Sequence, residues 1–314
     1  MKQIILDTNI LRKWFTQSDP EFDDNKTLQI KRMIKEKGII ILFSKPVAYE
    51  LLCNFKKPTE EAQNSSYYSL KYLSEISIIK TENETDTRAF SPSFLGLYCN
   101  YFYEKLFDSI NKYEINIPYL VYSFLEDNDK EGYSELIKIL QEDKEAELNQ
   151  LVNNVKNFLK GHNNGVLDWN IFKTNKEKRR KLKFDYESKY LHLNLLYSQL
   201  LSVNLHSNNE ELNLMRNLSD GISDFSVSLD FYISFIYNKL MDGSNLDFNE
   251  IPNMKKKWNS FYDYQLILAC EFENALGKET TFITNDKPIL YKFKKFNKEK
   301  FVMNQEQLEK FLFD

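Results

Sequence analysis

Glycine, proline and cysteine are scarce in this chain. Its 314 residues include 8 Gly, 7 Pro and 3 Cys. Gly and Pro are the residues that most often interrupt regular structure, so their scarcity favours a helix-rich protein. The cysteines, Cys53, Cys99 and Cys270, lie far apart and form no C-x-x-C pair. This argues against a disulfide framework or a zinc knuckle and fits a reducing cytoplasm.

Long hydrophobic runs are also missing. The apolar run at residues 4–6 meets Asp7 after only three residues, which is too short for a signal peptide. The most apolar later segment, Phe225 to Tyr237, carries Asp230 and several serines. It falls short of the roughly 20 apolar residues that span a bilayer. We therefore expect a soluble, cytoplasmic protein with no membrane partner.

An excess of positive charge and several catalytic motifs are absent. The formal net charge is −4, so a nucleic-acid partner would have to be held by local basic patches. His162, His192 and His206 share no metal-binding spacing, and H-E-x-x-H, G-x-S-x-G and P-loop motifs do not occur. No Arg precedes a His at the spacing of helical ribonucleases. Asn9 stands where a D-x-D phosphatase would carry its second acid.

Short apolar runs at the two ends of the chain predict the strands of a parallel sheet. Residues 4–6, 39–43 and 280–284 are apolar or β-branched, as expected for strands covered on both faces. Residues 76–79 and 301–303 are expected to form two further strands. The helices expected around these strands cover 28–37, 60–74, 261–276 and 305–313.

Two residues near the second strand predict helix ends. Gly38 is expected to end the helix over 28–37, because glycine readily adopts the conformation that follows a helix. Ser44 is expected to cap the next helix, with Pro46 in its first turn. Both signals favour a strand–helix unit in this part of the chain.

The middle of the chain has a different pattern. Long helical patterns follow one another there without an evident strand, over 94–113, 130–160, 176–204 and 222–240. The flanking pieces together have the length of one ordinary domain. The predicted fold class is therefore α/β: a parallel sheet flanked by helices in 1–90 and 256–314, interrupted by a large all-α insertion over 91–255.

Four acidic residues stand out by their positions, and each has an ordinary structural explanation. Asp7, at a strand end, could form an Asx-type turn, and Glu50 could be an exposed helix residue. Asp263 could be the acidic half of a capping box, and Asp286 could be a helix N-cap. Taken singly, these structural interpretations outweigh a catalytic one.

Considered together, the four acids point to a metal site. Asp7 and Asp286 follow apolar strands at their carboxyl ends, where sites form in open parallel sheets. Glu50 lies early in the helix after the second strand, and Asp263 begins the helix that precedes the strand 280–284. Four converging carboxylates repel one another and need cations. Oxygen ligands suit Mg²⁺ or Mn²⁺ rather than zinc.

The segments around these acids resemble, in order, the motifs of the PIN-domain nuclease family. They are ILDTNIL at 5–11, SKPVAYELL at 44–52, SFYDYQLILAC at 260–270 and FITNDK at 282–287. Residues 301–312 resemble the family's last strand and helix. The resemblance covers 1–90 and 256–314, and the long insertion between the second and third motifs departs from it.

The resemblance implies an endonuclease that hydrolyses phosphodiester bonds, usually in RNA, with Mg²⁺ or Mn²⁺ as cofactor. It implies that Asp7 is the central metal ligand. Asp263 and Asp286 would complete the site, partly through water. Glu50 would bind a metal-bound water or a second metal.

Polar and basic residues near the acids are further candidates. Asn9 and Thr284 are expected to orient carboxylates or water, although turn and strand-end hydrogen bonding explains them equally well. Lys173–Lys183 holds seven basic residues and one acid, and Lys287–Lys300 holds six and one. Such segments either hold a nucleic-acid backbone or are solvated faces. The residues expected to bind nucleic acid are Lys178, Arg179, Arg180, Lys181, Lys255, Lys256, Lys257 and Lys287.

Three functions stay open at this point. The first is a metal-dependent endoribonuclease, with a toxin of a toxin–antitoxin pair or an antiviral defence effector as roles suggested by family analogy. The second is a DNA-directed nuclease on the same scaffold. The third is a non-catalytic PIN-like binding or interaction module, against which four mutually repelling carboxylates argue. A protein regulator and a homo-oligomer are left open as partners.

Overall fold

A computed structural model describes both ends of the chain and short parts of its middle. The described ranges are 2–15, 20–53, 60–80, 86–88, 90–91, 226–235, 262–271 and 279–314, with 138, 142, 146, 149, 153, 157, 160, 165–166, 174–177 and 180. Two compact units are present, and the first is discontinuous. It comprises Met1–Leu140 and Gln265–Asp314, and the second comprises Gln141–Tyr264.

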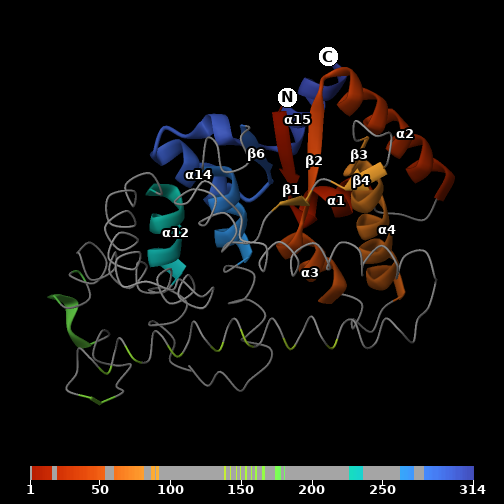
Figure 1. The fold of residues 1–314 in the computed structure, drawn as a ribbon. Coiled ribbons are helices and arrows are strands. Elements are labelled where there is room, and N and C mark those ends of the chain that lie inside the picture. The colour runs from red at the N-terminus through yellow and green to blue at the C-terminus, as the bar shows by residue number, and fades with distance from the viewer. Residues whose placement is uncertain are drawn as a thin grey trace, which may run out of the picture. The chain divides into compact units, whose positions relative to one another are not determined.

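Strands and helices alternate through most of the first unit (Figure 1). In chain order its elements are β1 (Lys2–Leu6), α1 (Thr8–Trp14), α2 (Pro20–Glu36), β2 (Ile39–Ser44), α3 (Lys45–Cys53), α4 (Glu60–Ile76), β3 (Ile78–Lys80), β4 (Asp86–Arg88), β5 (Phe90–Ser91), β6 (Thr280–Ile283), α14 (Lys287–Lys295), η4 (Glu299–Phe301), β7 (Val302–Met303) and α15 (Gln305–Phe313). Residues 262–271 are also helical, and the division between the units falls within this helix. The second unit contains α12 (Ser226–Phe235).

The core of the first unit is a parallel sheet with the strand order β5-β2-β1-β6-β7. Each neighbouring pair is parallel, and the two-residue β5 extends the sheet beside β2. β1 pairs with β2 through Ile5 and Leu42, and with β6 through Leu6 and Ile283. The expected α/β class with a parallel sheet is therefore confirmed.

The central strands are buried on both faces, which explains their unbroken apolar sequence. Ile4 and Ile5 of β1 and Phe282 of β6 have no exposed surface, and every residue of β2 is buried. Removing this apolar area from water is the main stabilising contribution of the sheet. A sheet covered on both faces leaves only its strand ends accessible to a ligand.

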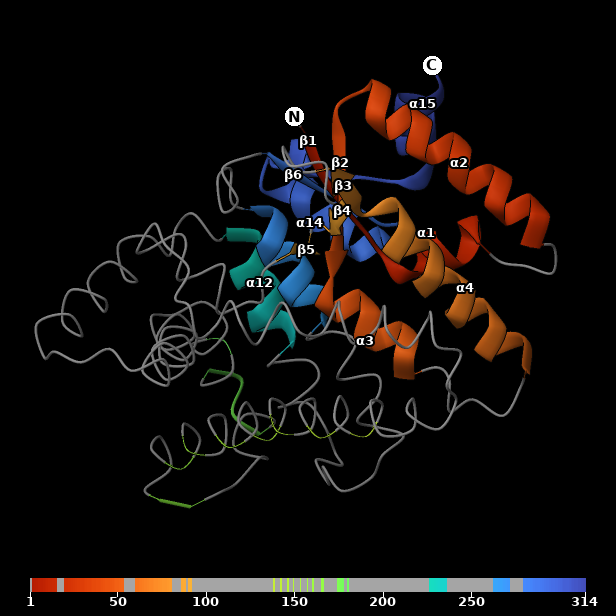
Figure 2. The ribbon, with the colours of Figure 1, turned by 45° about the vertical axis from the view of Figure 1, so that its right-hand side comes forward.

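Helices pack on the sheet from both sides. In both views α1, α2 and α4 lie together on one side of β1 and β2, and α14 lies on the other (Figures 1 and 2). Phe15, which follows α1, stacks on Tyr72 of α4 with ring centroids 4.6 Å apart. The two chain ends lie near each other. Lys2 Nζ is 5.6 Å from the ring centroid of Phe311 in α15.

The predicted helix end at Gly38 is confirmed, whereas the predicted cap at Ser44 is not. Gly38 has a φ of 61°, and its N–H donates to the carbonyl of Lys35. The helix before it, α2, begins at Pro20 and is longer than the expected 28–37. Ser44 instead completes β2, and its hydroxyl is buried without a hydrogen-bond partner among the described residues.

The expected strand at 76–79 forms in part and belongs to another sheet. Ile76 ends α4, and the strand β3 begins at Ile78. β3 pairs antiparallel with β4 in a separate two-stranded sheet. A strand of three residues does not specify which neighbour it joins, and here β5 takes the place beside β2.

Predictions for the middle of the chain are only partly within the described residues. The helix expected over 222–240 contains α12, and no described helix is long and apolar enough to cross a membrane. The helix expected over 94–113 lies outside the described residues. Only separate positions of 130–160 and 176–204 are described. The boundaries expected for the insertion stay a prediction.

Candidate active site

The polar residues of interest lie where β1 and β6 run side by side. From β1 the chain continues to β2 on one side, and β6 occupies the other side of β1. This is a switch point of the kind at which open α/β sheets bind ligands beyond the carboxyl ends of their strands. Asp7 follows β1 and Thr284 follows β6, one residue beyond the pair Leu6–Ile283.

Asp7 is held at this edge by its backbone and its side chain. Its N–H donates to the carbonyl of Ile283 at 3.0 Å, and its carbonyl accepts from the first turn of α1. Its Oδ2 accepts from Thr284 Oγ1 at 2.5 Å and from Asn9 Nδ2 at 2.6 Å. The structure therefore brings both predicted orienting residues, Asn9 and Thr284, to the carboxylate of Asp7.

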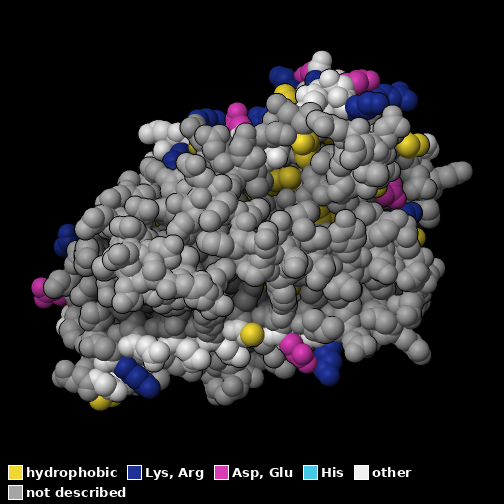
Figure 3. Space-filling view, in the orientation of Figure 1, with side chains coloured by type: hydrophobic (Ala, Val, Ile, Leu, Met, Phe, Trp, Pro, Cys, Tyr) yellow, Lys and Arg dark blue, Asp and Glu magenta, His cyan; other side chains and the backbone are white. Residues whose placement is uncertain are grey.

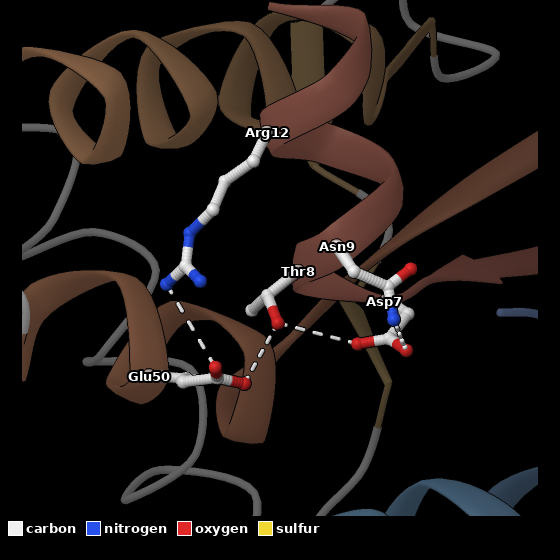
Figure 4. Close-up of polar contacts among 5 residues, drawn as sticks. All are labelled: Asp7, Thr8, Asn9, Arg12 and Glu50. Carbon is white, nitrogen blue, oxygen red and sulfur yellow. Dashed lines mark hydrogen bonds and ion pairs between the residues drawn. The ribbon is translucent and has the colours of Figure 1, made fainter. Parts of the chain in front are cut away.

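Glu50 lies close to Asp7, and one hydroxyl group connects them (Figure 4). Thr8 Oγ1 is 2.8 Å from Glu50 Oε2 and 3.2 Å from Asp7 Oδ1. A hydroxyl carries a single proton, so it can donate to only one of these carboxylates at a time. The second contact is satisfied when Asp7 is protonated and donates to Thr8.

The electrostatics of Asp7 agree with this geometry. The pKa of Asp7 is raised from 3.8 to about 6. Burial is the largest cause and the nearby charge of Glu50 adds to it, while hydrogen bonds from Thr284 and Thr8 act in the opposite direction. No Lys, Arg or His within the described ranges forms an ion pair with Asp7. At neutral pH the group is therefore an ionised, buried carboxylate without a cationic partner in that part of the chain.

Arg12 compensates the charge of Glu50 on the side away from Asp7 (Figure 4). Its Nη2 is 3.7 Å from Glu50 Oε1, which is an ion-pair distance but too long for a hydrogen bond. The same Nη2 is buried and has no hydrogen-bond partner among the described residues. Arg12 thus retains a donor beside the acidic pair.

Asp286 serves as the N-cap of α14 and is joined to Asp7 through Thr284. Its Oδ1 accepts from the N–H of Ile289 at 3.1 Å, and its own N–H donates to Thr284 Oγ1 at 3.0 Å. Asp286 is half-buried, and its Oδ2 forms no hydrogen bond within the described ranges. The N-cap interpretation holds, and one carboxylate oxygen stays available.

Of the remaining predicted site residues, Asp263, Lys287 and Arg180 lie within the described ranges. Asp263 is half-buried in the helix 262–271 and belongs to the second unit, so its role stays a prediction. Lys287 is the exposed first residue of α14, and Arg180 is exposed and helical. The other basic residues lie outside the described ranges: Lys178, Arg179, Lys181, Lys255, Lys256 and Lys257.

The cluster fits a small divalent cation bound by few protein ligands. Within the described residues no group of three or more His, Cys, Asp and Glu side chains could hold a metal. Mg²⁺, however, is commonly bound through one or two carboxylates, with water filling the other positions. Extending the β1–β2 register by two residues places Ser44 beside Asp7. The unpartnered hydroxyl of Ser44 offers a further oxygen there.

Three residues of this edge were missed as site residues by the sequence analysis. Thr8 and Arg12 lie on α1, four residues apart and so on one face of the helix, and Ser44 was expected only as a cap. The helical spacing of Thr8 and Arg12 is a signal that could have identified them. Ser44 required the strand register.

Comparison of the chain with protein-family models, with curated proteins and with solved structures finds no match.

Proposed function

We propose that this protein is a divalent-metal-dependent nuclease of the PIN type that hydrolyses phosphodiester bonds, most readily in RNA. The observation that carries the proposal is the state of Asp7. It is a buried carboxylate at the switch point of a parallel sheet, beside Glu50 and without a cationic partner among the described residues. Burying a charge this way costs stability unless a cation binds it.

The residues of the cluster have distinct tasks in this proposal. Thr284 and Asn9 hold Asp7 Oδ2 and fix the orientation of the carboxylate. The hydroxyl of Thr8 lies between the carboxylates of Glu50 and Asp7 and so holds the two acids close together. Asp7 loses its proton above pH of about 6, so it is ready to bind a cation at neutral pH.

Bound Mg²⁺ or Mn²⁺ would supply Lewis-acid activation of water and of the scissile phosphate. Asp7 and Glu50 would hold the ion, and Asp286 has a carboxylate oxygen with which to join them. Asp263 is proposed as a further ligand only because its segment resembles a PIN motif. Arg12, whose side chain is 30% exposed at the same edge, would bind a phosphate oxygen of the substrate.

The experiment that tests the proposal combines cleavage with metal binding. The full chain is incubated with fluorescent single-stranded RNA and DNA of one sequence, in Mg²⁺, in Mn²⁺ and in EDTA. We expect metal-dependent cleavage of RNA by wild type and none by Asp7→Asn. Glu306→Gln, a change of one exposed carboxylate on α15, is expected to cleave as wild type does.

Metal binding is measured separately by the shift in melting temperature. Because Asp7 is mostly protonated below about pH 6, added Mn²⁺ is expected to raise the melting temperature more at pH 7.5 than at pH 5. Cleavage that survives EDTA, or a thermal shift that Asp7→Asn leaves unchanged, would contradict the proposal. Cleavage of DNA with RNA left intact would assign the site to DNA instead.

A further inference from the structure

One face of α14 is exposed and combines positive charge with an aromatic ring. Lys287, Tyr291 and Lys294 follow one another at spacings of four and three residues, so they lie on one side of the helix. Tyr291 is 68% exposed, and both lysines are exposed. The opposite side of the helix, Ile289 and Phe293, is buried in the core.

The charge of the segment that contains α14 is unbalanced, although the whole chain is acidic. The segment 287–300 holds six lysines and a single acid, Glu299. Lys298 is used by a buried ion pair with Glu271. Lys287 and Lys294 form no ion pair within the described part of the chain. In Figure 3, Lys and Arg side chains lie at the upper surface over α14.

This exposed side begins at the acidic cluster. The N–H of Asp286 donates to Thr284 Oγ1, and Thr284 donates to Asp7. Lys287 therefore comes one residue after the hydrogen-bond network that contains Asp7. From there the helix carries Tyr291 about one turn, and Lys294 about two turns or roughly 10 Å, away from the cluster.

An exposed tyrosine between two lysines matches the chemistry of an unpaired nucleotide chain. Lysine ammonium groups bind backbone phosphates, and an exposed ring stacks on a base face. In a duplex the base faces are already stacked on their neighbours, so the ring finds no free face there.

We propose that Lys287, Tyr291 and Lys294, the α14 stripe, bind single-stranded RNA and guide it to the acidic cluster. This inference rests on the proposed nuclease function and specifies its substrate class. The two lysines contact successive phosphates, and Tyr291 stacks on an unpaired base between them. The α14 stripe therefore selects single strands over duplexes before any bond is cut.

The test measures binding in EDTA, so that cleavage plays no part. Fluorescence anisotropy of the full chain with a fluorescein-labelled 12-nucleotide oligouridylate is followed at several salt concentrations. Tyr291→Ala is expected to weaken binding about tenfold, from loss of one stacked base, and Tyr291→Phe to stay near wild type. Lys287→Ala/Lys294→Ala should weaken binding and reduce the salt slope by up to about 1.4, about 0.7 for each phosphate contact.

Two comparisons show whether the effect belongs to the α14 stripe and to single strands. Lys35→Ala/Lys310→Ala makes the same charge change on exposed residues of α2 and α15, and it should retain wild-type affinity. A duplex of the same length should bind Tyr291→Ala as it binds wild type. Single-stranded DNA should bind no more tightly than RNA.

The inference is overturned by any of four results. Wild type fails to bind the oligouridylate, Tyr291→Ala binds it normally, the control pair loses as much affinity as the stripe pair, or DNA binds more tightly than RNA. Normal binding by Tyr291→Ala together with Mn²⁺-dependent cleavage would remove this inference and leave the nuclease. Stripe-dependent binding without cleavage in Mn²⁺ would remove the nuclease.

Discussion

Asp7 and Glu271 are the two acidic residues buried within the described part of the chain, and their surroundings differ in charge. Glu271, in the helix 262–271, has a fully buried side chain, and Lys298 Nζ lies 2.7 Å from its Oε1. Asp7 is surrounded by neutral donors from Thr8, Asn9 and Thr284, and by a second acid, Glu50.

The two acids differ in whether a described cation neutralises them. A buried carboxylate is tolerated when a cation neutralises it, as Lys298 neutralises Glu271. Hydrogen bonds to Asp7 hold its orientation but do not remove its charge, and its pKa is raised to about 6. The fold thus keeps one buried negative charge that no cation among the described residues neutralises.

The largest effect is expected from removing the positive charge beside Glu271. Lys298→Met leaves Glu271 buried without its cation and should lower the free energy of unfolding by roughly 3 kcal/mol. The double variant Lys298→Met/Glu271→Leu removes both charges and should recover most of that loss. Urea unfolding at pH 7 measures both. A loss below about 1 kcal/mol in Lys298→Met would show that the pair is not needed to neutralise Glu271.

A smaller effect, with a defined pH dependence, is expected from Asp7→Asn. The folded pKa of about 6 lies above the ordinary 3.8, so the protonated carboxyl stabilises the fold at low pH, and this stability is lost as pH rises through 6. Asparagine does not ionise. Relative to wild type, the variant should therefore gain roughly 2 kcal/mol of unfolding free energy between pH 4 and 7.

Urea unfolding at several pH values, without divalent metal, tests this dependence. Glu306→Gln removes one exposed carboxylate from α15 and so separates the effect of the site from the effect of net charge. Parallel stability curves for wild type and Asp7→Asn between pH 4 and 7 would mean that Asp7 is not a destabilised, buried charge.

The smallest effect is expected from replacing Arg12. This residue partly neutralises the charge of Glu50, whereas Asp7 has no such cation among the described residues. The pair is partly exposed and 3.7 Å apart, so Arg12→Gln should change the unfolding free energy by less than about 1 kcal/mol. Loss of the positive charge should strengthen Mn²⁺ binding about threefold, as expected for one charge several ångströms away in water. Calorimetric titration measures it, with Arg32→Gln, exposed on α2, as control. Weaker Mn²⁺ binding by Arg12→Gln would contradict the idea that the cation binds at Asp7 and Glu50, beside Arg12.

Local sequence signals predicted much of the fold. The apolar runs at 4–6, 39–43 and 280–284 contain or overlap β1, β2 and β6, and the amphipathic pattern of 305–313 coincides with α15. Asp286 before a proline does cap its helix, as expected from a short-range rule. These features depend on residues within a few positions of each other, so a single sequence is enough to predict them.

The errors occurred where a local signal had a distant competitor. Ile78 and its neighbours form a strand, but they pair with β4 rather than joining the parallel sheet. Ser44 has the chemistry of a cap, yet the extension of β2 places it in the strand. In both cases strand pairing, which depends on residues far along the chain, decided the outcome.

The sequence by itself determined the α/β class, the polar residues at the carboxyl ends of β1 and β6, and the helix signals at Gly38 and Asp286, because each follows from periodicity or short-range backbone chemistry. Only the tertiary structure decided which charges meet. The β1–β6 register puts Thr284 against Asp7 across 277 positions, and the packing of α1 on α3 sets Arg12 beside Glu50. Burial, a property of the assembled core, then raises the pKa of Asp7. The distances between these side chains are set by the packing of segments that are remote in the sequence, so a local sequence pattern does not predict them.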